Sequence, residues 1–478
     1  MNKVQTSDNT ISSADIDKIE SYDPNGYVFF WNGNIYRAIY EKQRSHVEEL
    51  FNCGLIKDLI KRRLIPHTDI TNYSTNDCSL VLKHTKIPCH SLPFEWSFSM
   101  LQDAAKITLE VNHIARKYGY QTIDAHPFNI LFHYNKPKFV DIGSFVKIET
   151  CYGKKSDGWR AFGEFQQSFY APLKLWSRGY VFFARHSLHG NQISFNDFLI
   201  LLRPLYRVFP PKLLKNFFYL YFSYKAFNTV HIDRFKQLVS VSTKREKIGN
   251  MIIALAHKNL LPFTFVNFEK LQNKTSKLQK QKIPSLWANY HSNIKPTERH
   301  EYILSSIQKL NIKTIFEFGG NAGFISQMIS DIYDIEHIIC SDYDDNAIDT
   351  LYKDLRKKQL RITPVLMDFR ANISDNKFKA AQVRFKSEAV LALALTHHLI
   401  LTQNLSLKFI LERIKSFSNK YVFVEFMPQG LYSSNFDKLP LIPPWYTKNW
   451  FRSEFEKHFR LVDEAQLEDN RCLFIGEI

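Results

Sequence analysis

Residues 312–326, IKTIFEFGGNAGFIS, decide the fold of the carboxy-terminal part of this chain. An apolar run at 312–316 predicts a buried strand, a glycine-rich segment follows at 317–323, and an apolar helical pattern continues over 323–332. A ligand at the carboxyl end of a parallel strand can lie against the backbone only where side chains are absent, and the next helix offers free amides. Because such loops serve several nucleotide cofactors, the loop predicts a nucleotide-binding edge without selecting the cofactor.

Carboxylates follow the next two predicted strands. The strand at 337–341 ends in Asp342, where a carboxylate can accept both hydroxyls of a ribose. The strand at 363–367 leads into Asp368 and Phe369, which would place an acid and an aromatic ring beside an adenine. The ribose position is shared with nicotinamide dinucleotides, whereas the acid on the adenine side favours S-adenosylmethionine.

Strands and helices alternate throughout residues 312–425, and this alternation predicts an α/β fold with a doubly wound, mostly parallel sheet. The chain then ends in two apolar runs that flank Asp469-Asn470, which predict a hairpin. Its last strand would be antiparallel and would complete a seven-stranded sheet. Such a strand ends a methyltransferase sheet but not a nicotinamide-binding one.

Taken in order, these segments resemble the motifs of class I S-adenosylmethionine-dependent methyltransferases, and residues 287–478 resemble the nodulation-protein-type methyltransferase family. The stretches that carry the resemblance are HSNIKPTERHEYI (291–303), IFEFGGNAGFIS (315–326), SDYDDNAID (341–349), RFKSEAVLALALTHHLILTQ (384–403) and KYVFVEFMPQGLY (420–432). In that family the glycine loop holds the methionine and ribose portions of the cofactor, and the acids after the second and third strands hold the ribose and the adenine. The resemblance assigns cofactor binding to Glu317, Gly319, Asn321, Gly323, Asp342, Tyr343, Asp368 and Phe369.

Two histidines follow the fourth predicted strand, where the acceptor should meet the methyl group. His397 or His398 could take a proton from an attacking hydroxyl, because histidine titrates near neutral pH. Both could instead cap the next helix or line the wall, and for His398 this second interpretation is favoured. Glu425, at the end of the fifth strand, is either a second polar wall or a satisfied edge carboxylate.

The resemblance therefore implies a methyltransferase that aligns its acceptor in line with the sulfonium of S-adenosylmethionine. No Asp/Asn-Pro-Pro-Tyr run follows the fourth strand, which favours oxygen or carbon acceptors over exocyclic amines. We expect O-methylation of a small molecule or a glycan, with residues 427–446 forming the acceptor loop.

The amino-terminal half contains a second pair of motifs with polar residues at a defined spacing. Asp124-Ala-His-Pro-Phe-Asn129 and Phe139-Val-Asp141-Ile-Gly143 resemble the catalytic loop and metal-binding turn of kinase-like phosphotransferases. The resemblance implies that Asp124 meets an acceptor, while Asn129 and Asp141 hold a metal-bound nucleotide. Alternatively, Asp124 and Asn129 simply stabilise turns.

This half also departs from the kinase pattern. The β-hairpin predicted at 27–40 contains no GxGxxG loop, no Val-Ala-Ile-Lys strand follows it, and His126 comes after Asp124 instead of before it. The sequence therefore predicts a degenerate kinase-like module of the α+β class. ATP-dependent phosphotransfer by this module is the alternative function.

Charge and composition limit the partners. The formal net charge is +16, and basic residues outnumber acidic ones between Lys174 and Lys247, which suggests either an anion-binding surface or a solvated helical one. A non-catalytic protein that binds an anionic partner is thus a third reading, although nucleic acid is not the favoured partner. Peripheral membrane contact and the oligomeric state stay open.

Six scattered cysteines without a CxxC pair predict neither a zinc site nor a disulfide framework. Together with the lack of a signal peptide or a long apolar segment, they suggest a cytoplasmic protein.

Five segments are expected along the chain. They are a mobile tail at 1–20, the kinase-like module at 21–158, a helical basic segment at 159–268, a linker at 269–283 and the methyltransferase domain at 284–478.

Overall fold

A computed structural model describes residues 9–19, 23–148, 150–151, 154–155, 158–190, 193, 198, 201–202, 268–281, 296–371, 379–432 and 441–478. Residues 1–8 and 20 of the predicted tail, and most of the basic segment beyond residue 190, lie outside the described residues. The chain divides into two compact units. Unit 1 comprises Met1–Ile87, Leu101–Leu131 and Pro137–Gln281, and unit 2 comprises Pro88–Met100, Phe132–Lys136 and Lys282–Ile478.

Unit 1 contains a five-stranded antiparallel sheet. Its strands, in spatial order, are β2 (Asp17–Lys18), β3 (Gly26–Trp31), β4 (Asn34–Ile39), β7 (Leu80–His84) and β5 (Thr68–Ile70). The hairpin expected at 27–40 is present as β3 and β4, and Asn32 and Gly33 form its turn with φ angles of 47° and 72°. Two helices, α1 (Glu41–Asn52) and α2 (Leu55–Lys61), follow β4, and Gly54 between them has a φ of 87°.

The long helix α3 (Phe98–Lys117) ends at Gly119, whose φ is 86°. Two short strand pairs follow it, and between them lie the turns that contain the kinase-like residues. These pairs are β8 (Tyr120–Thr122) with β11 (Phe145–Lys147), and β9 (Ile130–His133) with β10 (Lys136–Phe139).

Short elements make up the rest of the described part of unit 1. They are β1 (Thr10–Ile11), β6 (Ser74–Thr75), β12 (Thr150–Cys151), β13 (Lys154–Lys155), α4 (Phe162–Phe165), a π-helical turn (Gln166–Tyr170), α5 (Ala171–Trp176), α6 (Val181–Ser187) and α12 (Phe268–Ser276). Helix α12 occupies much of the segment 269–283 that the sequence suggests as a linker. No helix among the described residues has both the length and the apolar character needed to cross a membrane.

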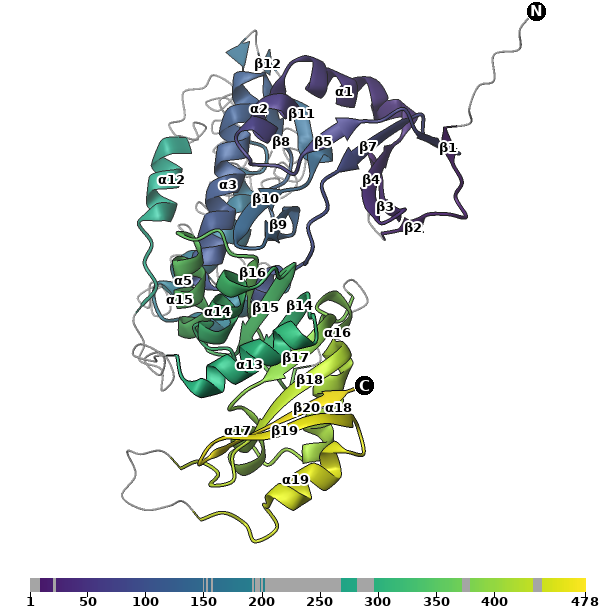
Figure 1. The fold of residues 1–478 in the computed structure, drawn as a ribbon. Helices are drawn as coiled ribbons and strands as arrows, with labels where there is room; N and C mark the ends of the chain where they lie inside the picture. The colour runs from purple at the N-terminus through teal and green to yellow at the C-terminus, as the bar shows by residue number, and fades with distance from the viewer. Residues whose placement is uncertain are drawn as a thin grey trace, which may run out of the picture. The chain divides into compact units, whose positions relative to one another are not determined.

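Unit 2 is built on a seven-stranded sheet, drawn in green to yellow in Figure 1. In spatial order the strands are β16 (Ile362–Leu366), β15 (His337–Asp342), β14 (Thr314–Phe318), β17 (Ser387–Ala392), β18 (Ser418–Phe426), β20 (Arg471–Glu477) and β19 (Arg460–Glu468). The first five strands are parallel, and β20 is antiparallel to both of its neighbours. The predicted seven-stranded sheet with an antiparallel last strand is confirmed.

Helices connect the strands of this sheet. They are α13 (Glu298–Lys309), α14 (Phe324–Ile332), α15 (Asp345–Leu355), α16 (Ala381–Arg384), α17 (Thr396–Leu401), α18 (Leu407–Phe417) and α19 (Lys448–Phe455). Aromatic rings fill the interior, and Phe316 lies 4.6 Å from both Phe318 and Phe417 between ring centroids. Because all three rings are buried, their apolar surface stabilises the sheet against its helices.

Two short segments from the amino-terminal half belong to unit 2. The 3-10 turn η1 (Pro93–Glu95) lies against the edge strand β16, which would otherwise present unpaired backbone groups. Glu95 forms a buried ion pair with Arg384 at 2.5 Å, and it also accepts a hydrogen bond from the Leu92 amide at 2.7 Å. The range 284–478 suggested by the sequence omits these segments, because local patterns do not reveal long-range packing.

We expect Arg384→Met to destabilise unit 2 by about 3–5 kcal/mol, because it leaves the Glu95 carboxylate buried without its cation. The free energy of unfolding from urea titration of the full chain would measure this loss. Lys457→Met, which removes an exposed partner of Glu454, is the matched control and should cost less than about 1 kcal/mol. Equal, small effects of the two substitutions would contradict the assignment of residues 88–100 to unit 2.

Candidate functional site

The glycine loop lies between β14 and α14, as the sequence predicts. Gly319, Asn321 and Gly323 all have left-handed backbone conformations, with φ angles of 65°, 51° and 71°. The Gly320 amide donates to the carbonyl of Ser341 at 3.0 Å, which holds the loop against the end of β15. The loop therefore folds back over the carboxyl ends of β14 and β15.

The three glycines have different roles. A Cβ atom on Gly323 would lie 2.6 Å from Leu351, and one on Gly320 would collide with the Cys340 sulfur, so both positions are needed for packing. A Cβ atom on Gly319 would instead lie 3.2 Å from Leu395, a residue of the loop after β17. Gly319 is thus the glycine whose bare backbone faces the carboxyl ends of the central strands.

Glu317 is buried, with 3% of its surface exposed, and its carboxylate accepts a hydrogen bond from the Ser326 hydroxyl on α14. Burial raises the pKa of Glu317, and the bond from Ser326 partly opposes that shift. The side chain therefore joins strand to helix and makes the start of α14 rigid.

Asp342, the last residue of β15, is 8% exposed. One of its oxygens accepts a hydrogen bond from the Asn321 amide at 2.9 Å, and the other accepts one from the Asp344 amide at 2.8 Å. Burial raises the pKa of Asp342 to about 6, although the backbone amides favour the charged form. The carboxylate is thus bonded directly to the glycine loop.

The other predicted cofactor residues differ in accessibility. Tyr343 is 58% exposed beside Asp342, and Asp368 lies at the surface, where it pairs with Arg370 at 2.8 Å. Phe369 is only 7% exposed, and its ring lies edge-on to Phe318 with centroids 4.8 Å apart. Its ring is therefore mainly part of the core, which leaves little surface for an adenine.

His397 and His398 lie on α17, with ring centroids 4.0 Å apart. His397 is 5% exposed, and its Nδ1 is buried without a hydrogen-bond partner. Burial, with help from the charges of His398 and Arg471, lowers the pKa of His397 to about 3. The near-neutral titration expected from the sequence is therefore not what the fold provides, and His397 is a neutral imidazole at physiological pH. Burial also lowers the pKa of His398.

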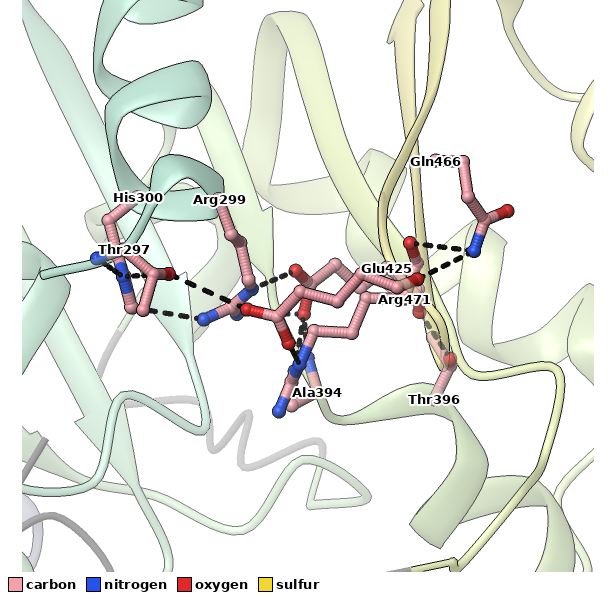
Figure 2. A network of polar contacts seen from close by, with 9 residues as sticks. Thr297, Arg299, His300, Ala394, Thr396, Glu425, Gln466 and Arg471 are labelled. Atoms are coloured by element: carbon pink, nitrogen blue, oxygen red, sulfur yellow. Dashed lines mark hydrogen bonds and ion pairs between the residues drawn. The ribbon is translucent and has the colours of Figure 1, made fainter.

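Sequence reasoning missed a network around Glu425, which is shown in Figure 2. Arg299 from α13 binds the Glu425 carboxylate through two nitrogens, at 2.5 and 2.9 Å, and Arg471 from β20 binds it at 3.1 Å. Burial alone would raise the pKa of Glu425, but the two arginines outweigh it and lower the pKa. Of the two interpretations offered for Glu425, the satisfied carboxylate is the one observed. Arg299 lies in the stretch 291–303 that carries the family resemblance, but nothing in the sequence pairs it, or Arg471, with Glu425.

The kinase-like residues of unit 1 also lie together. The Asn129 side-chain nitrogen donates to Asp124 at 2.7 Å and to Asp141 at 3.5 Å. Burial raises the pKa of Asp141 to about 6, which Arg37 on β4, 3.7 Å away, partly opposes. The sequence did not indicate Arg37. Within the described part of the chain, no group of three or more His, Cys, Asp or Glu side chains is arranged to hold a metal ion.

No protein-family model matches the sequence. A seven-stranded sheet in this strand order, with β20 antiparallel, is consistent with a methyltransferase fold. The chain is a homologue of Nodulation protein NoeA from Rhizobium meliloti (strain 1021), with 23% identity over 439 residues that span 85% of this chain and 84% of that protein.

Three solved structures are similar to parts of the chain. The methyltransferase domain of bacterial CtHen1 matches 38% of this chain and 97% of its own, with 14% identity and a TM-score of 0.30. A SAM-dependent methyltransferase from Aquifex aeolicus matches 38% and 94%, with 16% identity and a TM-score of 0.28. A putative O-methyltransferase from Nostoc punctiforme PCC 73102 matches 40% and 60%, with 13% identity and a TM-score of 0.30.

We expect the His397 ring to remain neutral throughout the range from pH 5 to 8, because its pKa is lowered to about 3. Proton NMR of the imidazole signals would show this, with His397→Asn identifying the resonance by its loss. A titration midpoint between pH 6 and 7 would contradict the burial and the charge effect of Arg471.

Proposed function

We propose that unit 2 binds S-adenosylmethionine and transfers its methyl group to an acceptor. The observation that carries the proposal is the hydrogen bond between the Asn321 amide and Asp342, because it places a carboxylate directly beside a glycine loop at the carboxyl edge of a parallel sheet. An antiparallel β20 beside β18 supports the choice of this cofactor over a nicotinamide dinucleotide.

The residues present fit the cofactor. An ionised carboxylate has about four acceptor sites. Two of those on Asp342 take the amides of Asn321 and Asp344, and the Tyr343 amide also favours the charged form, so at least one acceptor site is left for a ribose hydroxyl. Gly319, in the same loop as Asn321, carries no side chain, and Asp368, whose side chain is 42% exposed, is the candidate for the adenine side.

When bound, S-adenosylmethionine supplies an activated methyl group, so the protein mainly needs to orient the acceptor and exclude water. His397 is neutral, and its Nδ1, which is buried without a partner, would accept a hydrogen bond from an acceptor hydroxyl once the ring or the loop beside it moves aside. This role does not require His397 to be a strong base. His398 is also lowered in pKa, and it serves as a wall of the same region.

We further propose that the acceptor atom is an oxygen on a small molecule or a glycan. The absence of an Asp/Asn-Pro-Pro-Tyr run after β17 supports this choice over an exocyclic amine. The described ends of the loop at 427–446 include Trp445, which is 51% exposed, and exposed Leu441. An exposed indole suits the apolar face of a sugar or an aromatic ring.

A second candidate function belongs to unit 1. The side chain of Asn129 bridges Asp124 and Asp141, and this arrangement supports nucleotide binding or phosphotransfer by a degenerate kinase-like module. The third reading, an anion-binding protein without catalysis, depends on the basic segment at 174–247, most of which lies outside the described residues.

Isothermal titration calorimetry of the full chain separates these functions. We expect S-adenosylmethionine to bind the wild type, and we expect Gly319→Val and Asp342→Ala to lose binding at least about tenfold, by filling the glycine space and by removing the ribose acceptor. Gly33→Val is the matched control, because Gly33 has the same left-handed conformation with nothing within 4 Å of its added Cβ. Binding of magnesium ATP alone would overturn the proposal in favour of unit 1.

The affinity for S-adenosylmethionine should fall as the pH drops below about 6. Ribose binding needs the charged carboxylate, and the raised pKa of Asp342, about 6, means that acid protonates this group in the free protein. The dissociation constant should rise about tenfold per pH unit below that value. Calorimetry from pH 5 to 7 tests this, with Asp342→Asn expected to bind weakly at every pH. A dissociation constant for the wild type that is equal at pH 5 and pH 7 would refute the role of Asp342.

A further inference from the structure

The carboxylate of Glu425 is fully buried at the end of β18, where residues from α13, from β20 and from the loop after β17 bind it (Figure 2). We propose that Glu425 is a positioning residue that fixes the loop between β17 and α17, and with it the position of Leu395 against Gly319. This proposal rests on the proposed binding of S-adenosylmethionine by unit 2.

Glu425 is not free to act on a substrate itself. Its two oxygens take two hydrogen bonds from Arg299 and one each from Arg471 and the Ala394 amide. One oxygen accepts from Arg299 alone, and the other accepts from Arg299, Arg471 and the Ala394 amide. Because the side chain is fully buried against these groups, it does not reach a substrate, and its effect must pass through the groups it holds.

The loop after β17 is held by Glu425 at two points. The Ala394 amide donates to the Glu425 side chain at 2.9 Å, and the Thr396 hydroxyl donates to the Glu425 main-chain oxygen at 2.7 Å. Ala394 has a φ of 49°, a left-handed conformation that a residue with a Cβ atom rarely adopts. Such a conformation persists only where the surroundings hold it, and the bond to Glu425 is one contact that does so.

The loop contains Leu395, which lies against Gly319, and it leads into α17, which contains His397. Leu395, between the two held residues, is the side chain nearest to a Cβ atom built on Gly319, at 3.2 Å. His397 follows Thr396 on the first turn of α17. A shift of the loop would therefore change both the space beside the glycine backbone and the place of the imidazole.

Charge explains why a carboxylate is needed at this point. Arg299 and Arg471 have only 10% and 17% of their side-chain surface exposed, and Glu425 is their shared partner. Arg471 also pairs with Glu468 in the last hairpin at 2.9 Å. Replacing Glu425 with an amide removes the buried negative charge that both arginines share, while Arg471 keeps Glu468, so the arginines should rearrange and release Ala394.

The test combines three measurements on the full chain: S-adenosylmethionine affinity by calorimetry, hydrogen exchange of residues 393–398, and the melting temperature. Glu425→Gln and Thr396→Val should each raise the dissociation constant about tenfold or more and speed exchange in the loop. Thr396→Ser keeps the hydroxyl and should behave like the wild type. Arg384→Met removes a different buried pair at the β16 edge, and it should lower the melting temperature without changing the affinity.

The outcomes are distinguishable. If the wild type does not bind S-adenosylmethionine, the proposed function fails, and hydrogen exchange alone then decides whether Glu425 holds the loop. If the wild type binds and both loop variants bind equally well with unchanged exchange, the positioning role is refuted. A fall in affinity that simply follows the melting temperature, and that Arg384→Met reproduces, also refutes it. Thr396→Val keeps the test decisive should Glu425→Gln fail to fold.

Discussion

The hydrogen bond from the Asn321 amide to Asp342 is the interaction on which the candidate site depends. Parallel strands end at the same edge of a sheet, so the loops that follow neighbouring strands must share a small space. This bond joins the glycine loop after β14 to the end of β15. Because Asn321 itself has a φ of 51°, the bond also holds the loop in a conformation that the chain would otherwise avoid.

Two buried carboxylates at this edge show how surroundings assign different roles to similar groups. Backbone amides alone hold Asp342, and burial raises its pKa to about 6, so it keeps an acceptor site for a ligand and responds to pH. Two arginines bind Glu425, and their charges lower its pKa, so it stays ionised. A carboxylate held only by backbone amides suits a binding residue, whereas a fully buried one paired with two cations suits a residue that fixes the structure.

Unit 2 also includes two segments of the amino-terminal half, which pack against the helices of its sheet. The ring of Trp96 lies 5.1 Å from Phe132, and Phe132 in turn lies 5.8 Å from Tyr352 on α15. The Ser99 amide donates to the buried carboxylate of Asp349 at 2.7 Å. Residues near 90 and 130 thus cover part of the sheet unit, which means that the methyltransferase-like fold is not a simple carboxy-terminal module.

The sequence by itself determined the seven-stranded sheet, its antiparallel last strand and the positions of Gly319 and Asp342, because strand periodicity, glycine and the residue that ends a strand are local properties of the chain. Only the tertiary structure showed that His397 is neutral, that Phe369 belongs to the core and that Glu425 is bound by two arginines. Those properties depend on burial and on charges from distant segments, and the same holds for Glu95 and Arg384, which are 289 residues apart in the chain. The local sequence around a residue does not show which distant side chains will bury it. The pKa and the hydrogen-bond partners of such a residue are therefore set only when the chain folds.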